Sequence, residues 1–210
     1  MKKTIYVLAL STLFLSACKN NTKHDDDGHK HAKDMPMKNM DNMKNMNNHN
    51  GNMKDMDGVK KTALTVKKNV ATTPILDGYL SLKNALASDD KSGASKAANT
   101  MLKAFDAFDM SKLSEDEHKS YMDIVEDAKE QAEHIAKSPI AHQREHFENL
   151  STDINDLIVL LGTEKTLYKD FCPMAAEGKG AIWLSEFKEI KNPFFGSKMP
   201  TCGNVQSQIN

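Results

Sequence analysis

The sequence has little net charge and few residues of several types: three cysteines, one tryptophan and a single arginine among 210 residues. A formal net charge of −1, with no basic stripe interleaved with aromatics, excludes the usual nucleic-acid-binding surfaces. The sequence also has no Gly-x-Ser-x-Gly elbow, no phosphate-cradling glycine loop and no His-Glu-x-x-His helix. We therefore expect a binding protein and not an enzyme.

Only the first residues form a long apolar run. Lys2 and Lys3 precede the apolar stretch 5–15, and the run ends at Leu-Ser-Ala-Cys, which resembles a bacterial lipobox. We predict that residues 1–17 are a signal peptide and that Cys18 becomes the lipidated first residue. The protein would then be anchored in a bacterial envelope, on the periplasmic side of the inner or outer membrane or at the cell surface. The alternative is a soluble secreted protein that is cleaved near Ala17.

Residues 21–58 contain no leucine, isoleucine, valine, phenylalanine, tyrosine or tryptophan. Such a segment cannot bury enough apolar surface to fold by itself, so we predict a disordered tether over residues 18–70. Seven of the thirteen methionines nevertheless lie in this polar segment, where no core exists for them to fill.

Solvated thioethers are ligands for a soft cation, and Cu(I) is the biological cation that prefers them. Four histidines and the acidic run 25–27 share the segment, so Cu(II) could be held there through nitrogen and oxygen. The alternative is a low-complexity spacer with incidental methionines. The candidate ligands of the tail are His24, His29, His31, Met35, Met37, Met40, Met43, Met46, His49, Met53 and Met56.

Residues 71–210 show helical apolar periodicity over most of their length and predict one domain. The first helix should begin with Thr73 as N-cap, and the second should carry Ala94 to Phe108. A capping box at Ser114 should open the third, and the fourth should run from Ser138-Pro139 to Gly162. We therefore predict an all-α fold, an up-down-up-down four-helix bundle, followed by an irregular C-terminal cap segment.

The cap segment holds the other two cysteines. Residues 166–171 are predicted to be extended and Trp183-Leu184-Ser185 to be a short helix. If the segment folds back, two thiolates and two thioethers could meet as a Cu(I) site. Equally, the two cysteines of an exported protein could form a disulfide, worth about 3 to 4 kcal/mol in the chain-entropy model. The four candidate ligands are Cys172, Met174, Met199 and Cys202.

Nitrogen ligands for such a site could come from three further residues. His142 and His146 lie four apart on one predicted helix face, and His134 could face them across the turn at Ser138. The alternative is that these are solvated histidines near helix ends. Arg144 is better suited to clamp carbonyls or a carboxylate between the cap segment and the bundle, because its planar fork makes several bonds at once.

The cap motifs carry a family resemblance. The signature Cys-Pro-Met-Ala, Gly-Ala-x-Trp-Leu-Ser, Asn-Pro-x-Phe-Gly and Met-x-x-Cys-Gly resembles an exported bacterial family of unknown function. That family occurs as small lipoproteins and as fusions to membrane-fusion subunits of copper and silver efflux pumps. Stretches 79–86 and 143–147 are similar to its helical part. A related copper-transporter motif has histidine where Ala175 stands here, which leaves the source of a nitrogen ligand open.

The resemblance implies heavy-metal binding, chiefly of copper. We therefore expect an envelope lipoprotein that binds Cu(I), or the similar Ag(I), and acts as a scavenger or chaperone. Its partner would be an efflux pump or a copper enzyme. The alternative is a metal-free docking module of an envelope complex in which Cys172 and Cys202 form a disulfide.

Overall fold

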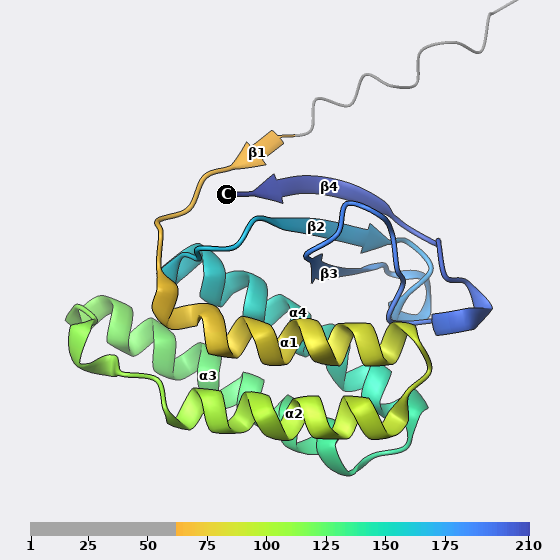
Figure 1. Ribbon diagram of the computed structural model, residues 1–210, viewed down its shortest axis with the longest axis horizontal. Helices are drawn as coiled ribbons and strands as arrows, with labels where there is room; N and C mark the ends of the chain where they lie inside the picture. Colours follow the sequence, from red (N-terminus) through yellow and green to blue (C-terminus); the bar gives the residue numbers. More distant parts are fainter. Residues whose placement is uncertain (1–61) are drawn as a thin grey trace, which may run out of the picture. The chain divides into compact units, whose positions relative to one another are not determined.

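The computed structural model describes residues 62–210, and this part of the chain forms four long helices and a four-stranded sheet (Figure 1). Among the described residues, none of the helices combines the length and apolar character that crossing a bilayer requires. The helices are α1 (Thr73–Ala87), α2 (Lys91–Asp106), α3 (Glu115–Lys137) and α4 (Ile140–Leu161). The strands are β1 (Thr62–Leu64), β2 (Leu167–Cys172), β3 (Ala181–Ser185) and β4 (Asn204–Ile209).

The helix ends follow from local sequence. The N-cap of α1 is Thr72, one residue before the predicted Thr73. Ser114 and Glu117 form the predicted capping box at the start of α3, which satisfies backbone N–H groups in both directions. Helix α4 ends at Gly162, whose φ of 82° is a conformation that glycine adopts without strain.

The helices pack through the apolar stripes that their periodicity predicts. Phe147 and Leu150 of α4 and Tyr79 of α1 are fully buried, as are Ala98 and Met101 of α2. Rings of Tyr79 and Phe147 stack with centroids 5.3 Å apart. Burial of one aromatic ring contributes several kilocalories per mole through area alone, roughly 25 cal/mol for each Å². The helical part is thus consistent with the predicted bundle.

The all-α prediction is wrong, because the C-terminal region forms a mixed sheet with strand order β1-β4-β2-β3. Strand β2 pairs antiparallel with both β3 and β4, and β1 pairs parallel with β4. The predicted extended segment at 166–171 corresponds to β2, but the predicted helix at Trp183-Leu184-Ser185 is part of strand β3. These residues are buried as a strand because both faces of β3 are covered.

The sheet lies against α1 and α4 (Figure 1). The hydroxyl of Tyr79 in α1 connects this helix to β3 and to α4. It accepts a hydrogen bond from the backbone N–H of Leu184 in β3 at 3.0 Å, and it lies 2.9 Å from Oγ of Ser151 in α4. The bundle and the sheet therefore share one core.

The predicted tether includes residues 62–69, but these residues contact the folded domain. Val66 N–H donates to the carbonyl of Asn210, and the Asn69 side chain donates to the carbonyl of Leu161 at 2.9 Å. Thr163 N–H donates to the carbonyl of Lys67 at 3.0 Å. The segment that precedes α1 thus completes the sheet and covers the end of α4.

Arg144 makes the predicted contacts between the helical bundle and the cap segment. Its Nε donates to the carbonyl of Pro193 at 2.9 Å, and its Nη2 donates to the carbonyl of Leu86 at 2.8 Å and to Asp89 at 2.6 Å. Asp89 also accepts from the backbone N–H of Ser197. These hydrogen bonds hold the pKa of Asp89 well below its usual range. One guanidinium therefore ties α4 to the end of α1 and to the cap segment.

Replacing Arg144 with alanine should lower the free energy of unfolding by about 2 to 4 kcal/mol, because two partly buried carbonyls lose charged donors. Arg144→Lys should recover only part of this loss, since one ammonium cannot reproduce the fork. Urea denaturation measures both variants. Lys103→Ala, on the exposed face of α2, is the control and should change stability by less than about 0.5 kcal/mol. A stability loss no larger in Arg144→Ala than in the control would show that the clamp is dispensable.

Strand β2 of the sheet contains a buried acidic side chain. Asp170 of β2 is fully buried, and neither carboxylate oxygen has a hydrogen-bond partner among residues 62–210. Burial raises the pKa of Asp170 to about 7, and the positive charge of Lys83 opposes that rise. Lys83 is itself buried and donates to Glu186 at 2.9 Å. Burial lowers the pKa of Lys83.

The folded state should lose stability as pH rises from about 4 toward 7, because it retains the Asp170 proton that the unfolded chain releases. Asp170→Asn removes this titration. The variant should therefore gain more stability relative to wild type at about pH 8 than at about pH 5. Urea denaturation at both pH values measures the difference, with the exposed Asp123→Asn as control. An equal effect of Asp170→Asn at the two pH values would contradict a raised pKa.

Candidate metal centre

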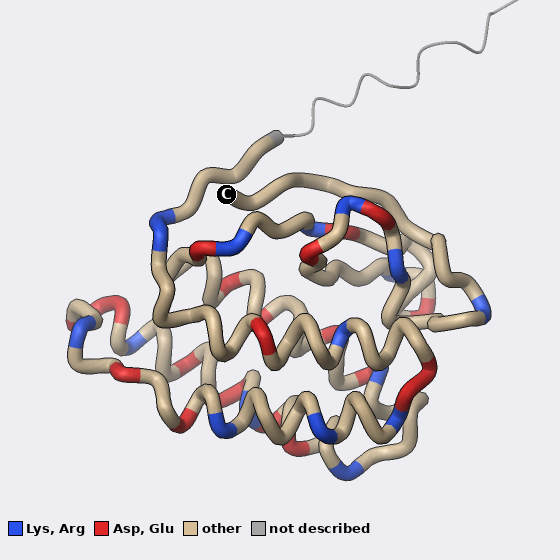
Figure 2. The backbone as a smooth tube through the Cα atoms, in the orientation of Figure 1, with Lys and Arg blue, Asp and Glu red and all other residues tan. Residues whose placement is uncertain are grey.

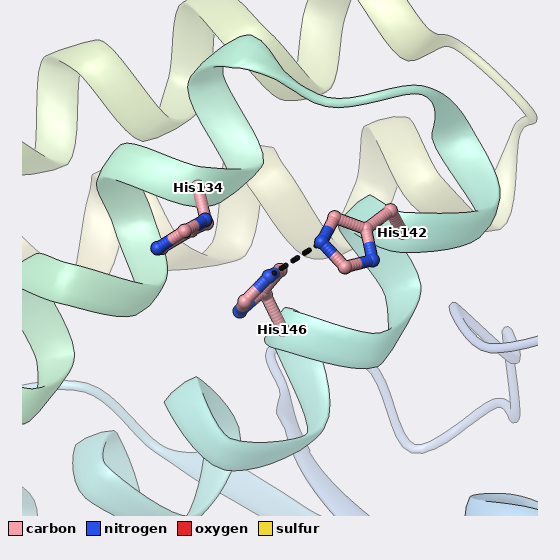
Figure 3. A group of neighbouring side chains, drawn as sticks. All are labelled: His134, His142 and His146. Atoms are coloured by element: carbon pink, nitrogen blue, oxygen red, sulfur yellow. Dashed lines mark hydrogen bonds between the residues drawn. The ribbon is translucent and has the colours of Figure 1, made fainter.

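Three histidines from two helices come together at one end of the bundle (Figure 3). His134 lies in the last turn of α3, and His142 and His146 lie one turn apart on α4. One ring nitrogen from each residue lies within 4.8 Å of the others. Within residues 62–210, this is the one group of at least three His, Cys, Asp or Glu side chains with such a spacing. We call these three residues the histidine triad.

The turn between α3 and α4 creates this arrangement. Ser138 and Pro139 are both extended, so the chain reverses at once, and proline at the start of α4 lacks an N–H that would otherwise be unsatisfied. Gln143 points inward from the first turn of α4 and is fully buried. Its amide donates to the carbonyl of Ile135 at 2.9 Å and to Oγ of Ser95 at 3.1 Å. Because Gln143 faces the core, the neighbouring His142 is turned outward.

Two of the imidazoles are oriented by oxygen atoms. Nδ1 of His142 lies 2.5 Å from Oε2 of Glu145, and Nδ1 of His146 lies 2.7 Å from Oε1 of Gln131. An oxygen acceptor beside each Nδ1 favours the tautomer that carries its proton there, and the Nε2 of such a neutral ring carries a lone pair. This is the arrangement in which second-shell groups orient metal-binding histidines.

The two Nε2 atoms then face each other at 3.0 Å. Two lone pairs at this distance repel unless a proton or a metal cation lies between them. A metal ion at the usual nitrogen distance of about 2.0 Å can contact both atoms. The ring of His134 stacks on that of His146 with centroids 4.4 Å apart and an interplanar angle of 14°. His134 therefore has to rotate its ring to become a third ligand.

The electrostatics favour the neutral form of His146. Burial is the main cause that lowers the pKa of His146, and the neighbouring His134 and His142 lower it further. A neutral imidazole is the form that binds a metal ion, so less proton competition has to be overcome.

Elsewhere in the described chain, basic and acidic side chains are interspersed along the helices (Figure 2).

The predicted sulfur ligands lie at another place. Cys172 ends β2 and is fully buried, and Cys202 precedes β4 and is partly exposed. Their Sγ atoms are 2.8 Å apart, and both residues are free thiols. The Met174 side chain is 56% exposed, whereas Met199 is partly buried. The histidine triad does not include either cysteine, so the nitrogen and sulfur donors form separate groups.

The cysteine pair is held by the cap segment. Asn192 donates through its side-chain amide to the carbonyl of Cys202 at 2.7 Å, and its Oδ1 accepts from the N–H groups of Phe194 and Phe195. The hydrogen bond with Cys172 is the main cause that raises the pKa of the Cys202 thiol, with a smaller contribution from burial. Cys202 is thus a protonated thiol at neutral pH.

An open groove of about 640 Å³ is lined by residues of α4 and of the loop that follows Cys172. Helix α4 contributes Glu145 and Glu148 to one wall, and the loop after Cys172 contributes Met174 and Ala175 to the other. Phe194, which also lines the groove, packs against the ring of Phe147 with centroids 5.8 Å apart. Glu145 therefore contacts the histidine triad and the groove at the same time.

Sequence reasoning placed the three histidines near one another and missed the two groups that orient them. Glu145 follows His142 by three residues, so its position on the same helix face could have indicated it. Gln131 lies one turn before His134, which is a weak signal without the structure. The predicted tail ligands, from His24 to Met56, and the lipidation site Cys18 lie outside the described residues.

Comparison with known proteins finds a similarity for the helical part only. Residues 75–166 match the model of an uncharacterised family, described as a protein of unknown function (DUF3347). The matched range contains the histidine triad, Gln131 and Glu145, and it ends before Cys172. No curated protein and no solved structure matches this chain.

Removing the orienting oxygen of Gln131 should weaken metal binding at the triad. We expect Gln131→Leu to lower the affinity for Cu(II) or Zn(II) by about 10- to 100-fold, the usual effect of losing a second-shell partner. Competition with a chromophoric chelator near neutral pH measures the affinity. Glu126→Gln, on the exposed side of α3, is the control. Equal affinities for Gln131→Leu and wild type would rule out an orienting role.

Proposed function

We propose that this protein is a lipid-anchored copper-binding protein of the bacterial envelope, a scavenger or chaperone, and that the histidine triad is its folded copper site. The observation that carries the proposal is the pair of Nε2 atoms 3.0 Å apart, each on a ring whose Nδ1 lies beside an oxygen. Such a pair is unfavourable when empty and neutral, and a bound cation relieves it.

Three donor types support copper over other metals. Imidazole nitrogen binds several divalent ions, and Cu(II) is the tightest of them in the Irving–Williams order. Thiol and thioether sulfur favour Cu(I). The chain offers imidazoles in the triad, thiols at Cys172 and Cys202, and seven methionines in the tail. Copper is the metal that uses all of these donors, through its two oxidation states; Ag(I) would share the sulfur ligands.

The proposal includes the anchor and the tail. A lipid on Cys18 would hold the protein at a membrane surface, and the tail would present its methionines and histidines to incoming ions. A recipient would be an efflux pump or a copper enzyme in the same compartment. The similarity of residues 75–166 to a family of unknown function is compatible with this role and does not specify it.

A second candidate is a docking module that binds no metal. It is favoured by the 2.8 Å separation of the Cys172 and Cys202 sulfur atoms, which is short enough for a disulfide to form with little movement. The Arg144 clamp would also be useful in a purely structural cap, because it fixes the segment that carries Cys202. In this case the histidines would be hydrogen-bonded surface residues.

Metal titration of the mature chain separates the two candidates. The chain from residue 18 onward, with Cys18→Ser so that no lipid is attached and with Cys172 and Cys202 oxidised to a disulfide, should bind Cu(II) with nitrogen hyperfine structure in its electron paramagnetic resonance spectrum. The double variant His142→Gln, His146→Gln should lose at least about tenfold in Cu(II) affinity, because two of three ligands are gone. Replacing the seven tail methionines with serine should lower the Cu(I) stoichiometry and leave the nitrogen signal intact.

His118→Gln is the matched control, because His118 also lies on α3 and outside the triad. If the double variant and His118→Gln bind Cu(II) equally well, the triad is not the site. If, in addition, no variant changes Cu(I) stoichiometry, copper binding is not the function and the docking module is favoured.

A further inference from the structure

We propose that Cys172 and Cys202 reduce Cu(II) taken up at the histidine triad to Cu(I) and become a disulfide, an inference that rests on the proposed copper site. The protein would then change the oxidation state of its ion and not only hold it. The substrate is Cu(II), and the product is Cu(I) for sulfur ligands.

The sheet itself makes the two thiols neighbours. Phe171 in β2 pairs with Asn204 in β4, so the residues that follow Phe171 and precede Asn204 leave the same end of two adjacent antiparallel strands. The Sγ atoms of Cys172 and Cys202 are 2.8 Å apart. Forming an S–S bond of about 2.05 Å requires a shift of less than an ångström. A ladder of backbone hydrogen bonds therefore holds the thiols ready for oxidation.

Cys172 and Cys202 are free thiols in the structure, and one of them is accessible. Cys172 is fully buried, whereas Cys202 is partly exposed, so an oxidant would meet Cys202 first. The hydrogen bond between the thiols raises the pKa of Cys202, which keeps it protonated at neutral pH. The two thiols together hold two electrons and two protons that can leave when the disulfide forms.

A neighbour of the triad and a neighbour of the thiols line the same groove. Glu145 holds Nδ1 of His142 and lines the groove, and Met174 lines the opposite wall. The backbone N–H of Met174 also hydrogen-bonds to the Cys202 sulfur. The Met174 side chain is 56% exposed, so its thioether is available to a soft ion on this path.

The reaction balances with two copper ions for each disulfide. Two S–H bonds break and one S–S bond forms between Cys172 and Cys202. The two protons go to solvent, and the two electrons reduce two Cu(II) ions, which reach the triad one after the other, to two Cu(I) ions. Cu(I) prefers thioethers to imidazole, so reduction also favours its transfer from the triad toward Met174 and the methionines of the tail.

The test uses the mature chain with Cys18→Ser, fully reduced and free of oxygen. Two equivalents of Cu(II) are added, Cu(I) is measured with a Cu(I)-specific chromophoric chelator, and free thiols are counted by alkylation and mass spectrometry. We expect about two Cu(I) per chain and a disulfide between residues 172 and 202. Cys202→Ser should retain the Cu(II) spectrum and reduce copper at least about tenfold more slowly.

A control with the wild-type sequence excludes misfolding of the Cys202→Ser variant as the cause of slow reduction. Wild-type protein that has first been oxidised at Cys172 and Cys202 by a disulfide-forming reagent should bind Cu(II) at the triad and leave it unreduced. The His142→Gln, His146→Gln variant, which retains both thiols, should reduce Cu(II) at least about tenfold more slowly than wild type when copper is substoichiometric.

The outcomes separate this inference from the function on which it rests. If wild type holds Cu(II) with nitrogen ligands while both thiols remain alkylatable, the reductase inference is wrong and the copper site stands. If reduction is equally fast in the histidine variant, the triad does not deliver the ion and the inference is again wrong. If wild type whose Cys172 and Cys202 have first been oxidised to a disulfide shows no nitrogen-ligated Cu(II), the proposed copper site itself fails.

Discussion

The arrangement at the metal-binding end of the molecule depends on the buried amide of Gln143. This side chain fixes the rotation of α4 about its axis, because it donates to the Ile135 carbonyl of α3 and to Ser95 of α2. With Gln143 turned inward, helical geometry turns His142 and His146 toward α3 and places Arg144 over the end of α1. The hydrogen bonds that this one buried amide donates therefore set the direction of the neighbouring functional side chains.

Neighbouring residues of α4 point in different directions and have three different roles. His142 and His146 face His134, Arg144 anchors the cap segment through the Pro193 carbonyl, and Glu145 orients His142 while lining the groove. A shift of α4 would therefore disturb the triad, the cap and the groove together. A short stretch of α4 therefore contacts both the nitrogen donors of the bundle and the cap segment near the sulfur donors. The two groups of donors share no ligand.

The sequence predicted the parts that depend on local rules. Gln143, Phe147 and Leu150 repeat with helical spacing, and they are buried on one face as predicted. Arg144 was predicted to hold the cap because its planar fork makes several bonds at once, and the structure has that contact. The proximity of His134 to His142 followed from the short turn at Ser138, whereas the hydrogen bond from His146 to Gln131 depends on how α3 is rotated, which spacing alone does not fix.

The sheet could not be predicted because its pairings are non-local. Strand β1 has three residues before the first helix, and it pairs with β4 at the other end of the chain. Strand β3 is a short apolar run without alternation, a pattern that a buried helix turn also shows. This misassignment matters chemically. In an irregular cap the two cysteines would meet only by chance of loop folding, whereas antiparallel pairing of β2 with β4 brings Cys172 and Cys202 together as a consequence of backbone hydrogen bonding. The sheet therefore does for the thiols what the turn between α3 and α4 does for the imidazoles: it fixes the distance between donors before any ion arrives, so that little ordering entropy remains to be lost on binding.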